Sequence, residues 1–315
     1  MALLQRLSIR RRRGAILCFH DVRSGSWLRD FLGKLRERAD VVRLACLVER
    51  QEGHGASAPN GQAQVALTFD DGYKSLRTVV EPVCSDMHLA LTTFVCSEVL
   101  TGGPAPWYDR ANLIVRRLGS ARAARYWGFD GDPGRTLLSA LKEAPQRLIL
   151  DGLARAESEA AIDPRPLCER FMREDDLVAV ARNPLVTVAS HTHSHPILAN
   201  LDPEAQRAEV FRGVEVLRGL CAAPVQFFAY PNGKPEDFDG NVIRTLHEAG
   251  IQAAVTTVQR PVLPQDDVMC LPRLGVSEGD SIGKLEMKWS LPWPSAGDMR
   301  ENRCRRRYRG FWSKH

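Results

Sequence analysis

The sequence has no apolar run long enough to span a membrane, no apolar centre of a secretory signal near its start, and no Cys-x-x-Cys pair. The first two absences argue against a membrane-spanning or secreted protein, so we expect the protein in the cytoplasm. Its eight cysteines occur singly along the chain. That spacing argues against a cysteine-based zinc or redox site, and we expect most of them to be reduced core residues.

Positive charge is concentrated at the two ends of the sequence, although the net charge is only +5. Residues 1–14 contain five arginines and no acid, and residues 296–315 contain seven basic residues and two acids. The stretch between these ends is therefore mildly acidic. No recognisable nucleic-acid-binding fold accompanies the basic ends, so nucleic-acid binding is disfavoured.

Aromatic side chains accompany the basic C-terminal end, namely Trp289, Trp293, Tyr308, Phe311 and Trp312. Rings and cations together suit a membrane interface with anionic lipid, and the arginines at 10–13 would add a second contact. Alternatively, both ends are solvated, and Trp289 and Trp293 close one end of the folded domain. The sequence leaves peripheral membrane association and solvated tails both open.

The chain has enough apolar residues, 44% of 315, to bury a sizeable core. Apolar runs alternate with segments of helical periodicity, which is typical of a parallel sheet built from strand-helix units. We expect seven strands, near residues 15–19, 65–69, 91–95, 185–189, 225–229, 251–257 and 269–271. Polar residues follow strand after strand: His20, Asp70, His191, Tyr230 and Arg273. Because barrel enzymes gather their site at the carboxyl ends of the strands, a barrel is favoured over an open sheet.

Residues 102–174 interrupt this alternation with an irregular helical pattern. The segment is long for a connection between strands, so we interpret it as a helical insertion at the rim of a site. The expected organisation is a basic tail over 1–14, one barrel domain over 15–275, and a basic, aromatic tail over 276–315. Two helix signals stand out: Asp202 before Pro203 predicts a capped helix start, and Pro82 predicts a kink in a helix over 74–87.

Two adjacent carboxylates, Asp70 and Asp71, end the apolar run at 65–69. Burying both is costly unless a cation or a proton lies between them, so the pair indicates a metal. The run at 185–189 ends in a segment with His191, His193 and His195. Histidines four apart can meet one ion from the same side of a helical turn, whereas an extended segment would place all three on one face.

The motif from Thr68 to Gly72, Thr-Phe-Asp-Asp-Gly, followed by His-Thr-x-Ser-His from 191 to 195, resembles the polysaccharide deacetylases of carbohydrate esterase family four, the NodB-homology group. The resemblance implies a distorted (β/α) barrel of about seven strand-helix units. It also implies a metal triad of Asp71, His191 and His195, with Asp70 as the general base. Zinc is the expected ion, and cobalt and nickel suit the same ligands.

The chain departs from the family pattern in two motifs. Ala229 stands where the family has an arginine, and Asn232 where it has a tyrosine, although a backbone N–H near Asn232 can still serve as oxyanion donor. Arg273 replaces the histidine that acts as general acid, and arginine cannot release its proton. Arg273 can instead pair with Asp70. That leaves His20 either as the acid or as a structural hydrogen-bonding residue near the barrel mouth.

The expected function is a metal-dependent hydrolase that removes N-acetyl or similar N-acyl groups from amino sugars of a polysaccharide or glycan. Tyr230, Pro231 and Trp107 are the expected substrate-binding residues, and Trp107 either stacks on a sugar ring or anchors the insertion. An alternative is a deformylase or deacetylase of a polyprenyl-phosphate-linked sugar at the cytoplasmic membrane face. A catalytically silent glycan-binding module is disfavoured, because a binder has no need of Asp70.

Overall fold

A computed structural model describes residues 14–53, 62–129 and 136–290. The arginines at 10–13 and the aromatic residues from Trp293 onward lie outside the described residues, and so does the expected membrane contact. Across the described ranges, no helix has the length and apolar character needed to cross a membrane.

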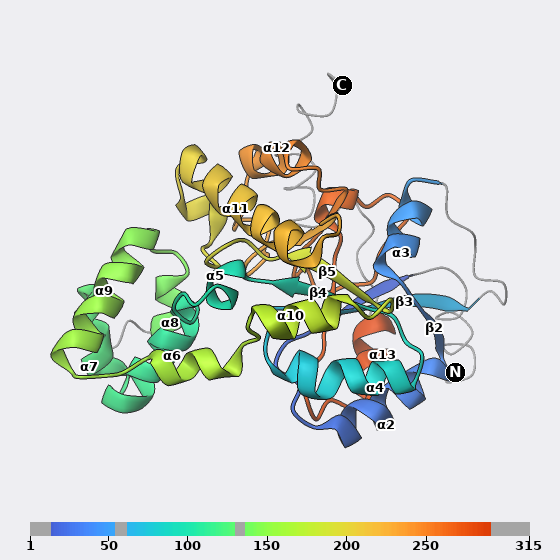
Figure 1. The fold of residues 1–315 in the computed structure, drawn as a ribbon, viewed down its shortest axis with the longest axis horizontal. Coiled ribbons are helices and arrows are strands. Elements are labelled where there is room, and N and C mark those ends of the chain that lie inside the picture. Colours follow the sequence, from blue (N-terminus) through green and yellow to red (C-terminus); the bar gives the residue numbers. More distant parts are fainter. Residues whose placement is uncertain (1–13, 54–61, 130–135, 291–315) are drawn as a thin grey trace.

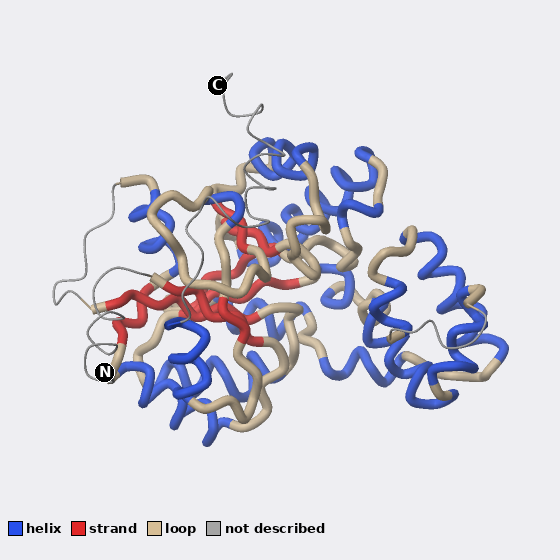
Figure 2. Tube along the Cα trace, turned by 180° about the vertical axis from the view of Figure 1, so that it is seen from behind, coloured by secondary structure: helices blue, strands red, loops and turns tan. Residues whose placement is uncertain are grey.

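The fold is built on one curled sheet of eight strands whose pairings are all parallel. The strand order is β7-β6-β5-β4-β3-β1-β8, and β2 pairs with the start of β3. Helices surround the sheet (Figures 1 and 2). This architecture confirms the predicted distorted (β/α) barrel. The strands are β1 (Ala15–Phe19), β2 (Ala39–Val42), β3 (Ala63–Phe69), β4 (Leu91–Val95), β5 (Val186–Ser190), β6 (Phe227–Ala229), β7 (Ala253–Val255) and β8 (Leu274–Gly275).

Residues 271–275 connect the two edges of the sheet. Leu271 bridges Val255 of β7, while Leu274 pairs with Leu17 of β1. The strand predicted at 269–271 is wrong, because residues 268–270 form a 3-10 turn, η5 (Val268–Cys270), and β8 begins only after Arg273. The carboxylate of Asp267 accepts the N–H of Met269, and such a side-chain bond to the backbone favours a turn over a strand.

Apolar side chains cover both faces of the strands. Alternate residues of β1 and β3 belong to two separate clusters, with Leu17 and Leu67 in the larger cluster, shared with the surrounding helices, and Ile16 and Ala66 in the smaller one. Strands buried on both faces need continuous apolar sequence, which explains why their runs were visible. The surrounding helices are α2 (Gly25–Arg36), α3 (Leu44–Gln51), α4 (Glu81–Asp86), α5 (Ser97–Leu100), α10 (Glu174–Ala181), α11 (Pro203–Cys221), α12 (Gly240–Glu248) and α13 (Ile282–Ser290).

Both helix signals have structural counterparts. Asp202 caps α11, and its carboxylate accepts the N–H of Ala205 at 2.8 Å. Within the helix predicted over 74–87, a π-helical turn, η1 (Leu76–Val80), leads directly into α4. Pro82 lies in the first turn of α4, immediately after η1, and its missing N–H coincides with the change from π-helical to α-helical geometry.

The folded domain continues beyond the predicted boundary at residue 275. Leu285 and Trp289 of α13 are buried and belong to the large core cluster. Trp289 therefore helps to close the fold, which is one of the two roles the sequence left open.

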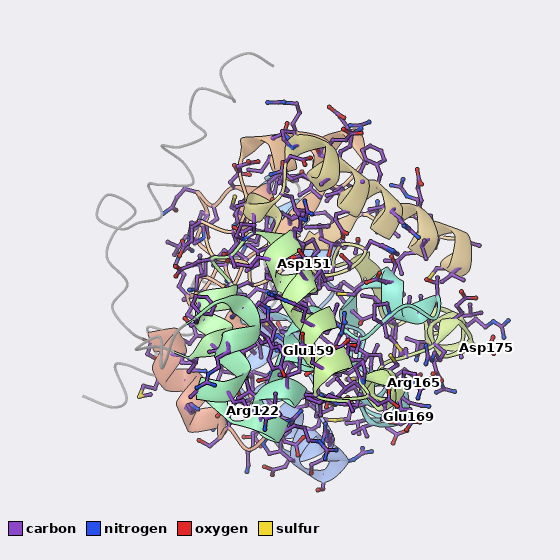
Figure 3. All side chains as sticks on the ribbon, turned by 90° about the vertical axis from the view of Figure 1, so that its left-hand side faces the viewer. Arg122, Asp151, Glu159, Arg165, Glu169 and Asp175 are labelled. Carbon is purple, nitrogen blue, oxygen red and sulfur yellow. The ribbon has the colours of Figure 1, made fainter. Side chains whose placement is uncertain are left out.

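The predicted insertion forms a helical lobe beside the sheet, drawn in green in Figure 1. It has a hydrophobic cluster of its own, which includes Trp107, Ile114 and Leu153. Charged side chains such as Arg122, Asp151 and Glu159 are exposed on its outer face (Figure 3). Its elements are α6 (Trp107–Leu118), α7 (Ser120–Ala124), η2 (Arg125–Trp127), α8 (Leu137–Leu141), α9 (Gln146–Glu159) and η3 (Arg165–Arg170).

Candidate active site

The structure brings the three predicted metal ligands together. Asp71 follows β3, and His191 and His195 follow β5, so all three lie at the carboxyl ends of strands. All are buried, and one ligand atom of each lies within 4.8 Å of the others. The Nε2 atoms of His191 and His195 are 3.4 Å and 3.5 Å from the Oδ1 of Asp71. Two imidazoles and a carboxylate are a donor set that suits a divalent transition metal.

Hydrogen bonding orients the ring of His191 for metal binding. Its Nδ1 donates to the carbonyl oxygen of Ala229 at 2.7 Å, which leaves the Nε2 lone pair directed at the cluster. Burial acts to lower the pKa of His191, but the hydrogen bond to Asp71 and the charges of Asp70 and Asp71 together outweigh it and raise that pKa. A divalent ion bound there would take the place of the proton that Asp71 favours.

His195 is held in its neutral form. Burial, followed by the neighbouring charge of His191, lowers the pKa of His195 to about 3. Its Nδ1 is buried and has no hydrogen-bond partner among the described residues. Neutral imidazole is the form that binds a metal, so the state of His195 fits the proposed ion.

The segment that carries these histidines is a loop, so its interpretation as a helical turn is wrong. Thr192 and His195 have positive φ angles of 67° and 62°, and the hydroxyl of Thr192 accepts the N–H of His195. His193 turns away to the hydroxyl of Ser97, 2.8 Å from its Nδ1. The alternative with three histidines around one ion is therefore not realised.

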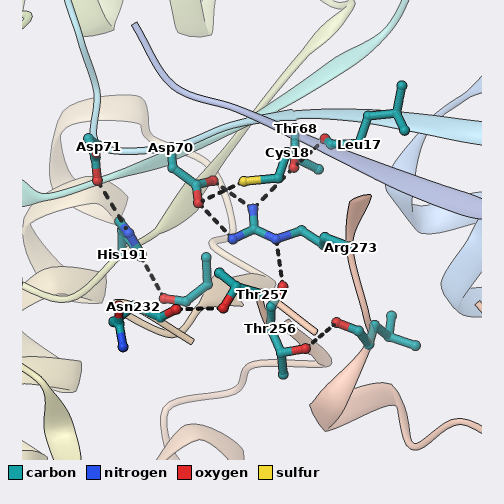
Figure 4. Close-up of polar contacts among 12 residues, drawn as sticks. Leu17, Cys18, Thr68, Asp70, Asp71, His191, Asn232, Thr256, Thr257 and Arg273 are labelled. Carbon is teal, nitrogen blue, oxygen red and sulfur yellow. Dashed lines mark hydrogen bonds and ion pairs between the residues drawn. The ribbon is translucent and has the colours of Figure 1, made fainter. Parts of the chain in front are cut away.

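Asp70 forms a buried, bidentate ion pair with Arg273, as the sequence suggested. Two guanidinium nitrogens lie 2.7 Å from the two carboxylate oxygens (Figure 4). Arg273 also donates to the carbonyl of Thr256 and the hydroxyl of Thr68. Burial acts to raise the pKa of Asp70, but the charge and the hydrogen bonds of Arg273, together with the nearby histidines, outweigh it and lower that pKa below its usual value. Asp70 is therefore ionised and fixed in one orientation.

His20 lies beside this pair at an exposed position after β1. One of its ring nitrogens is within 4.8 Å of a carboxylate oxygen of Asp70 and of the sulfur of Cys18. The Cys18 thiol is itself 3.5 Å from Asp70. His20 thus faces the catalytic candidates and remains in contact with solvent.

These groups line a cavity of about 600 Å³ whose wall includes the lobe. Its described lining is His20, Asp70, Asp71, Tyr73, Trp107, Tyr108, Asn112, Leu138, Lys142, His191, His195, Ile197, Tyr230, Asn232, Lys234 and Thr257. A volume of this size suits one small ligand.

The expected substrate-binding residues differ in their positions. Trp107 is buried and donates its Nε1 hydrogen to the carbonyl of His195 at 3.0 Å, so it anchors the lobe to the metal-site loop. Tyr230 is 1% exposed, stacks on Phe238 and donates its hydroxyl to a backbone carbonyl. Pro231 is buried and is not part of the described lining. Trp107 and Tyr230 also line the cavity, so substrate contact by these two residues stays a prediction.

Sequence reasoning placed the insertion at the rim of the site, but it missed Lys142. The ring of Tyr108 packs 4.8 Å from the ring of His195. Lys142 donates from its Nζ to the Oδ1 of Asn232 at 2.6 Å, across 90 positions of sequence. Tyr108 follows directly on Trp107, but no local pattern distinguishes Lys142 from other surface lysines.

Comparison with known proteins gives the same fold. A family model described as polysaccharide deacetylase matches residues 149–254. The deacetylase PplD of Streptococcus pyogenes in complex with acetate is 14% identical, with a TM-score of 0.59, and the match covers 88% of this chain and 97% of that one. IcaB from Ammonifex degensii is 17% identical, with a TM-score of 0.57 and coverage of 89% and 98%.

The deacetylase domain of BpsB from Bordetella bronchiseptica is 16% identical, with a TM-score of 0.56 and coverage of 84% and 96%. No curated protein sequence matches the chain. The family match and these folds confirm the predicted resemblance to the polysaccharide deacetylases.

We predict that Asp71→Ala, His191→Ala and His195→Ala each abolish tight binding of Zn²⁺, because each removes one of three donors. His193→Ala is the matched control and should keep the affinity, since His193 bonds to Ser97. Titration calorimetry with Zn²⁺ measures both. Loss of binding in His193→Ala with retention in His195→Ala would show that the ligand set is wrong.

We predict that Arg273→Met reverses the pH dependence of the contribution of Asp70 to stability. In the native protein the folded pKa is lowered, so that contribution is present above the unfolded value of about 3.9 and is lost as the pH falls. Without Arg273, burial raises the folded pKa, so stability is instead lost as the pH rises. An unpaired buried carboxylate costs about 3–5 kcal/mol.

Thermal unfolding between pH 2 and pH 8 measures this reversal, and Arg23→Met, which removes an exposed arginine paired with Asp21, is its control. Arg273→Lys keeps the charge and should give an intermediate curve. Parallel curves for Arg273→Met and Arg23→Met would contradict the prediction.

Proposed function

Because the chain resembles the polysaccharide deacetylases in sequence and in fold, we propose that it hydrolyses the acetamide of an N-acetylated amino sugar in a glycan with the help of a divalent metal. The observation that carries this proposal is that two adjacent carboxylates at one cavity have different partners. Asp70 pairs with Arg273, and Asp71 faces the two histidines. A base and a metal site lie side by side in that arrangement.

Asp71, His191 and His195 would hold the ion, and zinc suits this donor set best. When bound, such an ion lowers the pKa of water, so that a weak base can take its proton, and it polarises the amide carbonyl. Asp70 is the base that accepts the proton of the attacking water. Arg273 keeps that carboxylate ionised and oriented.

The oxyanion of the tetrahedral intermediate needs a hydrogen-bond donor, and the backbone at Asn232 can supply one. Asn232 has a φ angle of 59°, and its side chain is held by Lys142 and Asp237. Its backbone N–H has no acceptor among the described residues. The side chain thus fixes the loop and leaves the N–H for the reaction.

His20 donates the proton to the leaving amine in this mechanism. Arg273 occupies the position of the usual acid but is committed to Asp70 and cannot release a proton. His20 is close to Asp70 and exposed to the cavity, so it can exchange protons with solvent between turnovers.

We predict that the metal-loaded protein releases acetate from N-acetylated amino-sugar glycans. Asp70→Asn should retain Zn²⁺ and lower kcat by about 10²–10⁴, because only the base is removed. Enzymatic detection of acetate measures the release. Turnover by Asp70→Asn close to that of the native protein would reject the role of Asp70. No release from any N-acylated glycan or lipid-linked sugar would reject hydrolysis and favour a silent binding module.

We predict that His20→Gln lowers kcat by about 10²–10⁴ and removes the alkaline limb of the pH-rate profile, since that limb reports loss of the acid's proton. His88→Gln changes an exposed histidine outside the described cavity lining and is the control. A profile of unchanged shape with a near-normal rate in His20→Gln would assign His20 a structural role.

A further inference from the structure

Two lysines line the cavity, and the mechanism does not use their charges. Lys142 follows α8 in the lobe, and Lys234 lies in the loop after β6. The cavity therefore receives one cation from the insertion and one from the barrel. Neither forms an ion pair with a carboxylate of the described residues.

Lys142 is held in place by bonds to two other segments. The amide of Asn200 donates to the backbone carbonyls of Lys142 and Ala144 at 3.0 Å and 2.9 Å. The ammonium of Lys142 donates to Asn232 at 2.6 Å. An ammonium has three N–H donors, so this bond leaves donors that can reach a ligand. Its position at the cavity is thus preorganised.

The carboxylates nearby are already occupied. Asp70 is paired with Arg273, and Asp71 faces the metal histidines. Asp237 accepts the side-chain N–H of Asn232 and the backbone N–H of Lys234, both at 2.6 Å. Burial, followed by the charge of Lys234, lowers the pKa of Lys142, and the charge of Asp237 acts in the opposite direction. Two such cations in one concave wall favour an anion.

We propose that Lys142 and Lys234 bind an anionic group of the substrate, so that the protein selects N-acetyl sugars that carry a phosphate or a carboxylate. The inference rests on the proposed function and names its substrate class. The cavity of about 600 Å³ suits one small ligand, so the anion lies on the acylated sugar or on its immediate neighbour. A structural link between lobe and loop is the competing role of Lys142.

The test compares three N-acetylglucosamine derivatives: the neutral methyl glycoside, the 1-phosphate and the 6-carboxylate. Binding is measured by calorimetry on Zn²⁺-loaded Asp70→Asn protein, and acetate release on the native chain. We expect at least one anionic sugar to bind about tenfold or more tightly than the neutral one, because one charge-assisted hydrogen bond supplies enough free energy for that difference in affinity. Sodium chloride should weaken that preference. The anion that binds more tightly identifies the source of the charge.

The two lysines are tested in the Asp70→Asn protein by the ratio of the Kd for the neutral sugar to the Kd for the anionic sugar. Lys142→Gln and Lys234→Gln should each lower this ratio about tenfold, or to unity where the starting ratio is smaller than ten. The variant with both lysines replaced should have a ratio of unity. Glutamine at 142 can still donate to Asn232, so a purely structural link would keep the ratio. Lys34→Gln removes a charge on α2, outside the cavity, and should also keep it.

The inference would be overturned if Asp70→Asn protein with both lysines intact bound neutral and anionic sugars equally well. It would also be overturned if the variant lacking both lysines still preferred the anionic sugar. Acetate release from neutral glycans alone would leave the proposed hydrolysis standing and reject the anionic substrate. Preferential binding of an anionic sugar without acetate release from any sugar would support the inference and reject the hydrolysis.

Discussion

The buried ion pair between Asp70 and Arg273 is the interaction on which the barrel and its site both depend. Arg273 lies in the short segment that bridges β7 and β1, and Asp70 ends β3. Taking both charges out of water costs several kcal/mol for each ion, and only close geometry with further hydrogen bonds offsets that cost. The bidentate contact and the bonds to Thr68 and Thr256 supply this geometry. The same ion pair therefore helps to close the sheet and orients the carboxylate of Asp70.

This pair also explains how two adjacent carboxylates can be buried together. On a regular strand neighbouring side chains point to opposite faces, so a turn is needed to bring the second acid to the same cavity. Asp71 makes that turn with a φ angle of 72°, in the left-handed region that few non-glycine residues adopt. Each carboxylate then has partners of its own, Arg273 for Asp70, and His191 and His195 for Asp71. Because repulsion is removed by two different partners, the two acids can do different chemistry.

The sequence alone predicted the features of the fold and the site that depend on a pattern of neighbouring residues. Buried parallel strands were visible as apolar runs, and the candidate metal ligands were visible because they follow those runs directly. The strand before Arg273 was misplaced, because a local bond from Asp267 forms a turn there. The histidine loop was misread for a similar reason, since Thr192 rather than a helical hydrogen bond holds His195. Lys142 could not be predicted at all, because its place depends on how the lobe packs against a loop 90 positions away.

The lobe contacts two of the barrel loops that carry candidate functional groups. Trp107 donates to the backbone of His195, and Lys142 donates to Asn232. The first contact steadies a proposed metal ligand, and the second steadies the proposed oxyanion donor. An insertion attached at these two points cannot shift without moving the ligand, the donor or both. Change in the lobe would therefore alter the shape of the cavity and the alignment of the reacting groups together, which couples the choice of substrate to the rate of reaction.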